Sequence, residues 1–328
     1  MSLAGGAHRD MCAALFISGG LIMKKPLLKK LKKYVPLYIL ALPSILYLIV
    51  NNYLPMCGLV LAFKQYSFAK GIVDSPWNGI KNFTFLFGSK WAGIMFRNTI
   101  CYNIVFLVLN TIVAIIIAIL LGEVRKERRK KFYQTVILVP YLMSTVLVGY
   151  LVFAFFSGSN GFVNKSILEP LGREAVSWYT KKEAWPFILV VVQLWRSFGF
   201  QSIVYYATII GFDKSLYEAA AIDGATAGQQ IRRITLPLLR PTVIILTIMG
   251  LGRMFNSDFG LFYQVPQNSG MLYEVTTTID TFVYRTLMLD HDIGRSMAAG
   301  FLQSILGFIV VMLANTAVRK IDKDSAMF

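Results

Sequence analysis

The sequence predicts an all-α, polytopic membrane protein with six transmembrane helices, a cytoplasmic helical loop and both termini in the cytoplasm. Three observations support this fold class. Hydrophobic residues make up 56% of the 328 residues, and the mean hydropathy is +0.58. Several mainly apolar segments approach the length that crosses a bilayer, and Lys and Arg cluster on alternate sides of them. A soluble domain would not carry so much apolar surface.

Each expected span is a mainly apolar segment of roughly 20 residues, the length that an α-helix needs to cross a bilayer. The six segments are Pro36 to Tyr53, Thr99 to Leu121, Thr135 to Phe156, Trp185 to Ile210, Pro241 to Phe259 and Ser296 to Val318. Because the number of crossings is even, both termini lie on the same side of the membrane.

The distribution of basic residues predicts which side that is. The terminal stretches and the connections on their side hold 19 Lys and Arg, whereas the longer opposite loops hold 10. The positive-inside rule therefore places both termini in the cytoplasm. It also explains the net charge of +16, so we expect no nucleic-acid partner.

Three regions follow from this arrangement: an N-terminal extension with a basic interfacial segment (1–33), the membrane domain (34–319) and a cytoplasmic tail (320–328). Residues 1–22 lack the basic start of a secretory signal, and Met23 offers a second start. We expect residues 1–22 to be a disordered or misassigned extension. The basic amphipathic run that follows would lie along the inner membrane surface.

Enzyme and metal chemistry find little support. The chain has no P-loop and no Gly-x-Ser-x-Gly elbow, so it would neither cradle a nucleotide phosphate nor present a hydrolase serine. The histidines, His8 and His291, and the cysteines, Cys12, Cys57 and Cys101, lack metal-ligand spacing. We therefore expect no catalytic residue, no metal and no cofactor on this chain, and any energy that it uses must come from elsewhere.

The cytoplasmic loop 211–240 is long enough to form structure of its own. Ser215 and Glu218 have the spacing of a capping box, and three alanines follow in a helix-forming run. Gly224 can take the positive φ that ends a helix. The pattern therefore predicts a short helix that begins near Ser215 and ends near Gly224.

A second short helix is expected from Ala225 to Arg233, ending before Leu236 and Pro237. The two helices would form a compact element that projects into the cytoplasm. Its apolar side chains exceed what a solvated helix needs, which favours docking in a partner's groove. They are Leu216, Tyr217, Ala220 and Ile222.

The loop resembles the EAA loop of binding-protein-dependent ABC importer permeases. The match consists of Glu218-Ala219-Ala220, Gly224 after three residues, Ile234 after nine more, and then Leu236-Pro237. In that family the loop is a coupling helix that docks in a cleft of an ATPase subunit. The resemblance implies that Glu218, Ala219, Ala220, Asp223 and Gly224 transmit the ATPase movement. The alternative is that Glu218 only caps its own helix.

The resemblance covers nearly the whole chain from Met23. It is to the carbohydrate branch of the family and, more specifically, to its polysaccharide-type permeases. The stretches that carry it are YLPMCGLVLAFKQYS, SPWNGIKNF, DFGLFYQV and DTFVYRTL. It implies import of an oligosaccharide or polysaccharide fragment by alternating access, in the cytoplasmic membrane of a bacterium. Implied partners are a second permease in a heterodimer, two ATPase subunits that bind ATP and Mg, an extracellular or periplasmic solute-binding protein, and lipid.

Polar and aromatic residues inside the later spans are candidates for the substrate path, because each ionisable group there is costly and sugars need such contacts. Arg196 would cost about 2.5–3.5 kcal/mol against lipid, so it should face a cavity or a carboxylate. The candidates are Trp195, Arg196, Gln201 and Tyr205, near Gln193, and Arg253, Asn256 and Asp258. Asn110 is a weaker candidate that could simply bond a neighbouring helix.

The role of Arg253 and Asp258 stays open at this point. They lie five residues apart, so a pair within one helix needs a break near Gly252, and a pair between helices is equally compatible. Alternatively, they lock subunits together or lie at the outer interface.

Three other functions compete with sugar import. The same architecture could carry a polyol, a phosphate-bearing sugar or a peptide. A membrane-embedded glycan enzyme would need a carboxylate pair, for which Glu169 and Glu174 in one outer loop are candidates, although we expect them to be solvated loop charges. A gated channel would not need a coupling loop.

Overall fold

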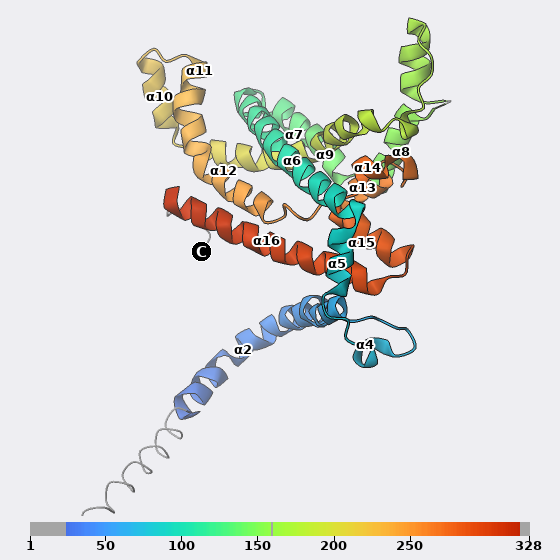
Figure 1. Ribbon diagram of the computed structural model, residues 1–328. Coiled ribbons are helices and arrows are strands. Elements are labelled where there is room, and N and C mark those ends of the chain that lie inside the picture. Colours follow the sequence, from blue (N-terminus) through green and yellow to red (C-terminus); the bar gives the residue numbers. More distant parts are fainter. Residues whose placement is uncertain (1–23, 159, 322–328) are drawn as a thin grey trace, which may run out of the picture. The chain divides into compact units, whose positions relative to one another are not determined.

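The computed structural model describes residues 24–158 and 160–321, and these residues are helical, with two isolated β-bridges and no strand (Figure 1). The expected extension over residues 1–22 and most of the expected tail lie outside the described residues. The chain divides into two units, residues 1–59 and 60–328, each of which is described by itself.

In the first unit, the first expected span is a continuous helical rod. It consists of α2 (Lys24–Leu48), a π-helical turn (Ile49–Tyr53) and α3 (Leu54–Met56), and a 3-10 turn (Cys57–Phe63) leads into the second unit. The apolar part, Tyr34–Phe63, is long enough to cross a membrane. Its apolar residues occupy all sides of the rod, as expected for a helix surrounded by lipid or by partner helices.

The second unit contains the remaining helices. They are α4 (Gly71–Asp74), α5 (Lys81–Gly88), α6 (Lys90–Glu123), α7 (Glu127–Leu142), α8 (Thr145–Phe156), α9 (Trp185–Ile210), α10 (Lys214–Ile222), α11 (Ala227–Gln230), α12 (Leu236–Leu251), α13 (Phe259–Gln264), α14 (Tyr273–Thr276), α15 (Ile279–Met288) and α16 (Ile293–Ile321). Short π-helical and 3-10 turns join them at Val163–Leu168, Glu169–Leu171, Trp178–Thr180, Lys182–Ala184, Ile231–Thr235 and Gly270–Leu272. Four segments of this unit, which contain α6, α9, α11 with α12, and α16, are long and apolar enough to span a membrane. The second, fourth, fifth and sixth predicted spans are thereby confirmed as membrane-length helices.

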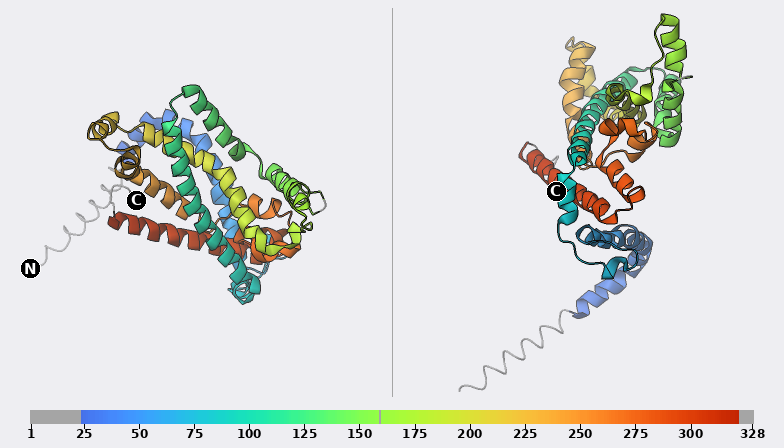
Figure 2. Two further views of the ribbon diagram at one scale, coloured as in Figure 1. Left: turned by 90° about the horizontal axis from the view of Figure 1, so that it is seen from above. Right: turned by 45° about the vertical axis from the view of Figure 1, so that its right-hand side comes forward.

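Helix α9 is the central packing element, since it lies along both α6 and α7. Figure 2 shows the teal α6 and the yellow-green α9 side by side. At Gly199 the backbones of α9 and α7 come so close that an added Cβ would lie 1.8 Å from the carbonyl oxygen of Ile137. A glycine is therefore required at this crossing, and it fixes how α7 and α9 pack.

The third predicted span, Thr135 to Phe156, is apolar as predicted, but it is not one continuous helix. It is a bent pair, α7 and α8, whose axes differ by 93°. Pro140 lies inside α7 near its end, and Ser144 starts a new helix by accepting a hydrogen bond from the backbone N–H of Leu147 at 3.3 Å. The local hydropathy that predicted the span does not register this break.

The fifth predicted span is also different at both ends. The second helix of the cytoplasmic loop does not end before Leu236, because a π-helical turn (Ile231–Thr235) joins α11 directly to α12. At the other end, α12 stops at Leu251 rather than at Phe259. The intervening residues 252–258 are not helical, and we call them the pinned loop, because side chains of other helices hold their backbone.

Candidate functional site

A cavity of about 360 Å³ lies among α6, α7, α9, α12 and the pinned loop. Its wall is mainly uncharged and mixes amide, hydroxyl, aromatic and aliphatic side chains. The polar lining residues are Asn103, Asn110, Tyr141, Gln193, Ser197, Gln201, Arg253 and Asn256, and the apolar ones are Phe106, Leu107, Phe200, Val204, Leu246, Gly250 and Met254.

The polar wall is built from side chains four residues apart on α9. Gln193, Ser197 and Gln201 share one helix face, which is the spacing at which side chains on a helix become neighbours. Ser197 Oγ donates to Asn110 Oδ1 at 3.1 Å, and the Asn110 amide donates to Gln201 Oε1. These bonds hold α6 and α9 together and leave a row of amides along the cavity.

One amide oxygen on this face has no protein partner. Gln193 Oε1 is buried and accepts no hydrogen bond from any residue that the structure describes. Buried polar atoms normally have a partner, and this side chain lines the cavity. Because the atom is covered by protein, it is an unsatisfied polar group inside the wall of the cavity rather than at its surface.

The aromatic wall contains a stacked pair. The rings of Tyr141 on α7 and Phe200 on α9 lie 4.9 Å apart at an interplanar angle of 15°. Both side chains are exposed, so their faces and edges are open to a ligand. Aromatic faces beside amide groups are suited to the alternating apolar and hydroxyl surfaces of a sugar.

The pinned loop closes one end of α12, and side chains from three other helices bind its backbone. Asn103 of α6 donates to the carbonyl oxygens of Met254 at 2.7 Å and Asn256 at 3.3 Å. Non-helical backbone inside a membrane domain needs such partners, because lipid offers none.

Two further helices hold the same loop. Gln303 of α16 donates to the carbonyl oxygen of Phe255 at 2.9 Å. Asp280 of α15 accepts from the backbone N–H of Ser257 at 2.6 Å. Together with Asn103 these contacts fix the backbone from Met254 to Ser257, so the loop is a rigid part of the cavity wall.

Arg196 and Asp258 form an ion pair between elements. The Arg196 guanidinium contacts Asp258 at 2.9 Å and donates to Thr145 Oγ1 at 3.1 Å. Asp258 also caps α13 by accepting from the backbone N–H of Leu261 at 3.0 Å. The expectation that Arg196 faces a carboxylate is confirmed. The alternative of a pair between Arg253 and Asp258 is wrong, because Asp258 binds Arg196 instead.

The predicted substrate-path residues divide into two groups. Gln201, Arg253 and Asn256 line the cavity, whereas Trp195, Arg196, Tyr205 and Asp258 do not. Several lining residues were not predicted from the sequence, among them Asn103, Tyr141, Ser197 and Phe200. The four-residue spacing from Gln193 to Gln201 could have revealed Ser197, and Asn103 lies seven residues before Asn110 on the same face of α6.

At the other end of α12 lies the elbow, residues 213–235, where α10 and α11 stand together (Figure 1). The N-cap of α10 lies two residues before the predicted one: it is Asp213, not Ser215, and its side chain accepts from the backbone N–H of Ser215 at 2.9 Å. This hydrogen bond lowers the pKa of the Asp213 carboxyl. The predicted capping box of Ser215 and Glu218 is therefore wrong, and so is the alternative that Glu218 only caps the helix.

The turn of the elbow follows the prediction. Gly224 has φ of +79°, a left-handed conformation that glycine adopts without strain. Thr226 and Gln229 form a capping box that starts α11. The elbow is therefore locally specified by its own sequence.

The elbow has an exposed face and a supporting face. Leu216, Glu218, Ala219 and Ile222 are exposed, and Ile222 exposes 87% of its surface. On the supporting side, the hydroxyls of Tyr217 and Thr235 hydrogen-bond at 3.0 Å, and Thr235 is buried. An apolar exposed face on a braced helix is the surface expected of a docking element.

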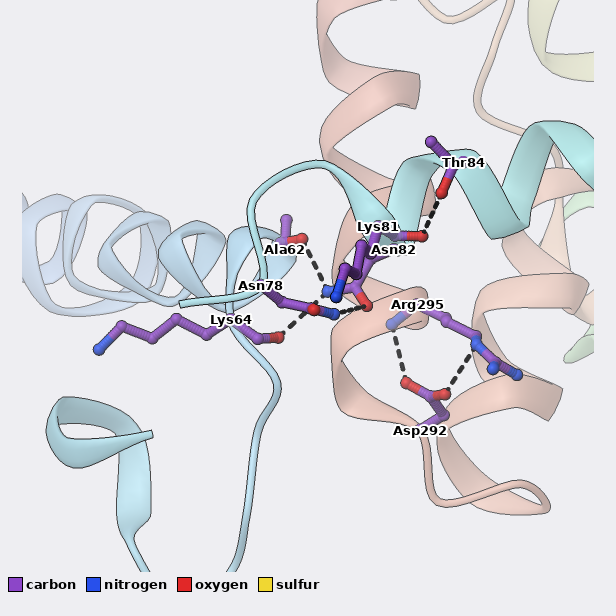
Figure 3. Close-up of polar contacts among 8 residues, drawn as sticks. All are labelled: Ala62, Lys64, Asn78, Lys81, Asn82, Thr84, Asp292 and Arg295. Atoms are coloured by element: carbon purple, nitrogen blue, oxygen red, sulfur yellow. Dashed lines mark hydrogen bonds and ion pairs between the residues drawn. The ribbon is translucent and has the colours of Figure 1, made fainter. Parts of the chain in front are cut away.

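A polar pocket of about 510 Å³ lies where α5 meets the start of α16 (Figure 3). Asn82 holds this region by donating to the carbonyl oxygens of Ala62 at 2.8 Å and Lys64 at 3.1 Å. Asp292 and Arg295 form an ion pair at 3.0 Å at the first turn of α16. The pocket lies at the opposite end of α16 from Arg319 and Lys320.

Comparison with known proteins now defines the class. The family model described as "Binding-protein-dependent transport system inner membrane component" matches residues 111–323. The chain belongs to this family. It is a transport permease and a multi-pass membrane protein, not an enzyme.

Several similar proteins are named as saccharide transport permeases, and others as sn-glycerol-3-phosphate permeases. The chain is 33% identical to the polygalacturonan/rhamnogalacturonan transport system permease protein YteP of Bacillus subtilis (strain 168), over 92% of this chain and 93% of that one. It is similar to the crystal structure of a bacterial ABC transporter involved in the import of the acidic polysaccharide alginate. The TM-score is 0.83 at 32% identity, and the match covers 90% of this chain and 99% of that one.

A second solved structure shows the alginate ABC transporter in complex with an alginate pentasaccharide-bound periplasmic protein. The TM-score is 0.81 at 32% identity, with 90% of this chain and 98% of that chain covered. The expected resemblance to sugar-importer permeases is confirmed.

Proposed function

We propose that this permease moves an oligosaccharide across the bacterial cytoplasmic membrane, and that the sugar passes through the cavity among α6, α7, α9 and α12. The observation that carries the proposal is the lining of the cavity, where a row of amides on α6 and α9 lies in the same wall as the stacked Tyr141 and Phe200. The cavity volume of about 360 Å³ falls within the roughly 300–1,000 Å³ usual for small-molecule sites. The names of the relatives support a saccharide as the cargo.

The proposed mechanism is alternating access, driven through the elbow. The elbow would dock in a cleft of an ATPase subunit that binds ATP and Mg, and Glu218, Ala219, Ala220, Asp223 and Gly224 would form or shape the contact. Because α11 runs into α12 without a break, movement of the elbow would reach the pinned loop along a single helix. A second permease and a second ATPase subunit would complete the transporter.

The orientation follows from the basic residues: the elbow and both termini face the cytoplasm. The polar pocket at the start of α16 then faces outward. With Lys81, Asp290, Asp292 and Arg295 in its wall, it would offer charged contacts to the sugar-loaded binding protein.

ATPase activity of the complete complex in lipid nanodiscs tests this function. Receptor loaded with an oligosaccharide should stimulate hydrolysis by the unaltered complex, and Glu218→Ala should abolish the stimulation. Glu169→Ala, which removes an exposed carboxylate from a loop outside the elbow, is the matched control and should leave stimulation unchanged.

Two outcomes would count against the proposal. Equal stimulation in the unaltered and Glu218→Ala complexes would contradict the role of the elbow. A response to a loaded polyol, phosphate-bearing sugar or peptide receptor, but to no oligosaccharide receptor, would overturn the cargo while retaining the architecture.

A further inference from the structure

We propose that Arg253 makes the cavity selective for saccharides that carry a carboxylate, that is, for uronate-containing oligosaccharides. This inference rests on the proposed function, because it assumes that the cavity holds a saccharide. It concerns the chemical class of that saccharide.

The first step is the charge of the cavity. Arg253 is the single ionisable Lys, Arg, Asp or Glu among the residues that line it, and the other polar groups are amides and hydroxyls. The cavity wall therefore carries one positive charge. A cation among membrane helices is costly unless a counter-charge or water accompanies it, so an intramembrane arginine marks a functional site by default.

The second step concerns the counter-charge. Within the described parts of the chain, the Arg253 guanidinium has no ion pair and no hydrogen bond. Two carboxylates belong to the same loop or bind it, Asp258 at its end and Asp280 at Ser257, and both are engaged elsewhere. Asp258 binds Arg196 at 2.9 Å, and Asp280 accepts from Ser257 Oγ at 2.7 Å and from Gln303 at 3.1 Å.

The backbone that carries the Arg253 guanidinium is held in position by other helices. Arg253 directly precedes Met254, whose carbonyl oxygen is held by Asn103, and the following residues are held by Gln303 and Asp280. The backbone that carries Arg253 is thus fixed from three helices, while its side chain is exposed. A charged group on a fixed backbone loses less conformational entropy when it binds a ligand, and this improves both affinity and selectivity.

The fourth step is the match between this group and a uronate. A planar guanidinium binds a carboxylate through two parallel, charge-assisted hydrogen bonds, which a neutral hydroxymethyl group cannot replace. The amides and the Tyr141–Phe200 pair in the same cavity suit the remaining hydroxyls and ring faces of the sugar. The wall therefore contains a complementary group for each part of a uronate unit.

A rival occupant of Arg253 is a carboxylate of the second permease. In that case Arg253 would have a structural role, and its removal would weaken the binding of charged and neutral sugars alike. The experiment below separates the two cases.

The test measures direct binding to the complete transporter in nanodiscs without the receptor, so that the receptor's own selectivity does not enter. The probes are a radiolabelled uronate oligosaccharide and the same oligosaccharide with its carboxylates reduced to primary alcohols. The proteins are the unaltered complex, Arg253→Gln, Arg253→Lys and, as a matched control, Arg240→Gln, which removes an exposed cation of α12 that does not line the cavity.

The unaltered complex should prefer the uronate form, and Arg253→Gln should weaken its binding about tenfold or more while changing neutral binding less than about twofold. Arg253→Lys should retain part of the preference, since it keeps the charge without the planar fork. The preference should fall with ionic strength in the unaltered complex and show little salt dependence in Arg253→Gln. Arg240→Gln should behave as the unaltered complex.

Equal binding of both probes to the unaltered complex would overturn the inference and leave saccharide transport intact. Equal weakening of both probes in Arg253→Gln would overturn it in favour of a structural charge. If neither probe bound while a non-saccharide solute did, both the inference and the proposed function would fail.

Discussion

The regions at the two ends of α12, the elbow and the pinned loop, take their shape from different kinds of contact. The elbow exposes its apolar residues and is shaped by local features: the Asp213 cap, the positive φ of Gly224 and the Thr226 capping box. The pinned loop receives its hydrogen bonds from α6, α15 and α16, and its partner Asn103 lies 151 residues from Met254. The elbow therefore presents an apolar surface to a partner protein. The pinned loop is instead held in position by other helices of its own chain.

This contrast has an energetic consequence. Changes in the loop should lower the stability of the subunit, because they leave polar backbone groups of the membrane domain without partners. Changes on the exposed face of the elbow should leave stability nearly unchanged and weaken coupling. The four predictions that follow test this division, from the largest expected loss of stability to the smallest.

Arg196→Met should give the largest loss of stability, about 2–3 kcal/mol, because it leaves Asp258 without its cation. This value is below the cost for a fully buried pair, since both side chains are partly exposed. Denaturant unfolding of the complex in lipid would measure it. Arg196→Met combined with Asp258→Asn should recover part of the loss, and a single variant as stable as the unaltered protein would show that the pair does not hold the loop.

Asn103→Ala should cost about 1–3 kcal/mol, because the carbonyl groups of Met254 and Asn256 lose their donor. Hydrogen exchange at residues 254–258 should accelerate together with the loss of stability. Asn160→Ala, which removes an exposed amide, is the control and should change neither. Unchanged exchange in Asn103→Ala would mean that the loop is held without this side chain.

Gly224→Ala should cost about 1 kcal/mol locally, because alanine is strained at φ of +79°. An added Cβ would meet no atom within 4 Å, so the effect is one of backbone conformation alone. Receptor-stimulated ATPase activity should fall much more than global stability does. Gly228→Ala, at an equally open position of α11 with negative φ, is the matched control and should retain full coupling.

Ile222→Ala should change stability by less than about 0.5 kcal/mol, because 87% of the Ile222 surface is exposed. Binding of the ATPase subunits to the permease pair, measured by titration in detergent, should nevertheless weaken. Val73→Ala, which shortens a similarly exposed aliphatic side chain outside the elbow, should leave assembly unchanged. Loss of stability in Ile222→Ala without loss of assembly would reverse the comparison.

The sequence predicted the features that depend on local pattern. Apolar runs located the membrane-length helices, and Gly224 marked the turn of the elbow, because hydropathy and backbone preference are written in consecutive residues. The choice of N-cap was wrong because Asp213 and Ser215 are both good caps two residues apart, and only the structure shows which one meets a free N–H.

Features that depend on residues far apart in the sequence could not be predicted from local patterns. The cost of placing Arg196 in a span was evident, but its partner Asp258 is 62 residues away. The cavity wall combines four helices and the loop, so neither its boundary nor the isolation of Arg253 follows from any one segment. The break between α7 and α8 was hidden because both halves are apolar around Ser144.

The contact of Gly199 with Ile137 limits how the helices of this permease can move. Because the two backbones touch, sliding α9 along α7 would bring side chains of the same helix face, three or four residues from Gly199, toward the Ile137 carbonyl. Such a slide would first require the two helices to separate. An axial displacement of α9 during a transport cycle is therefore easier at its contacts with other helices than at this crossing.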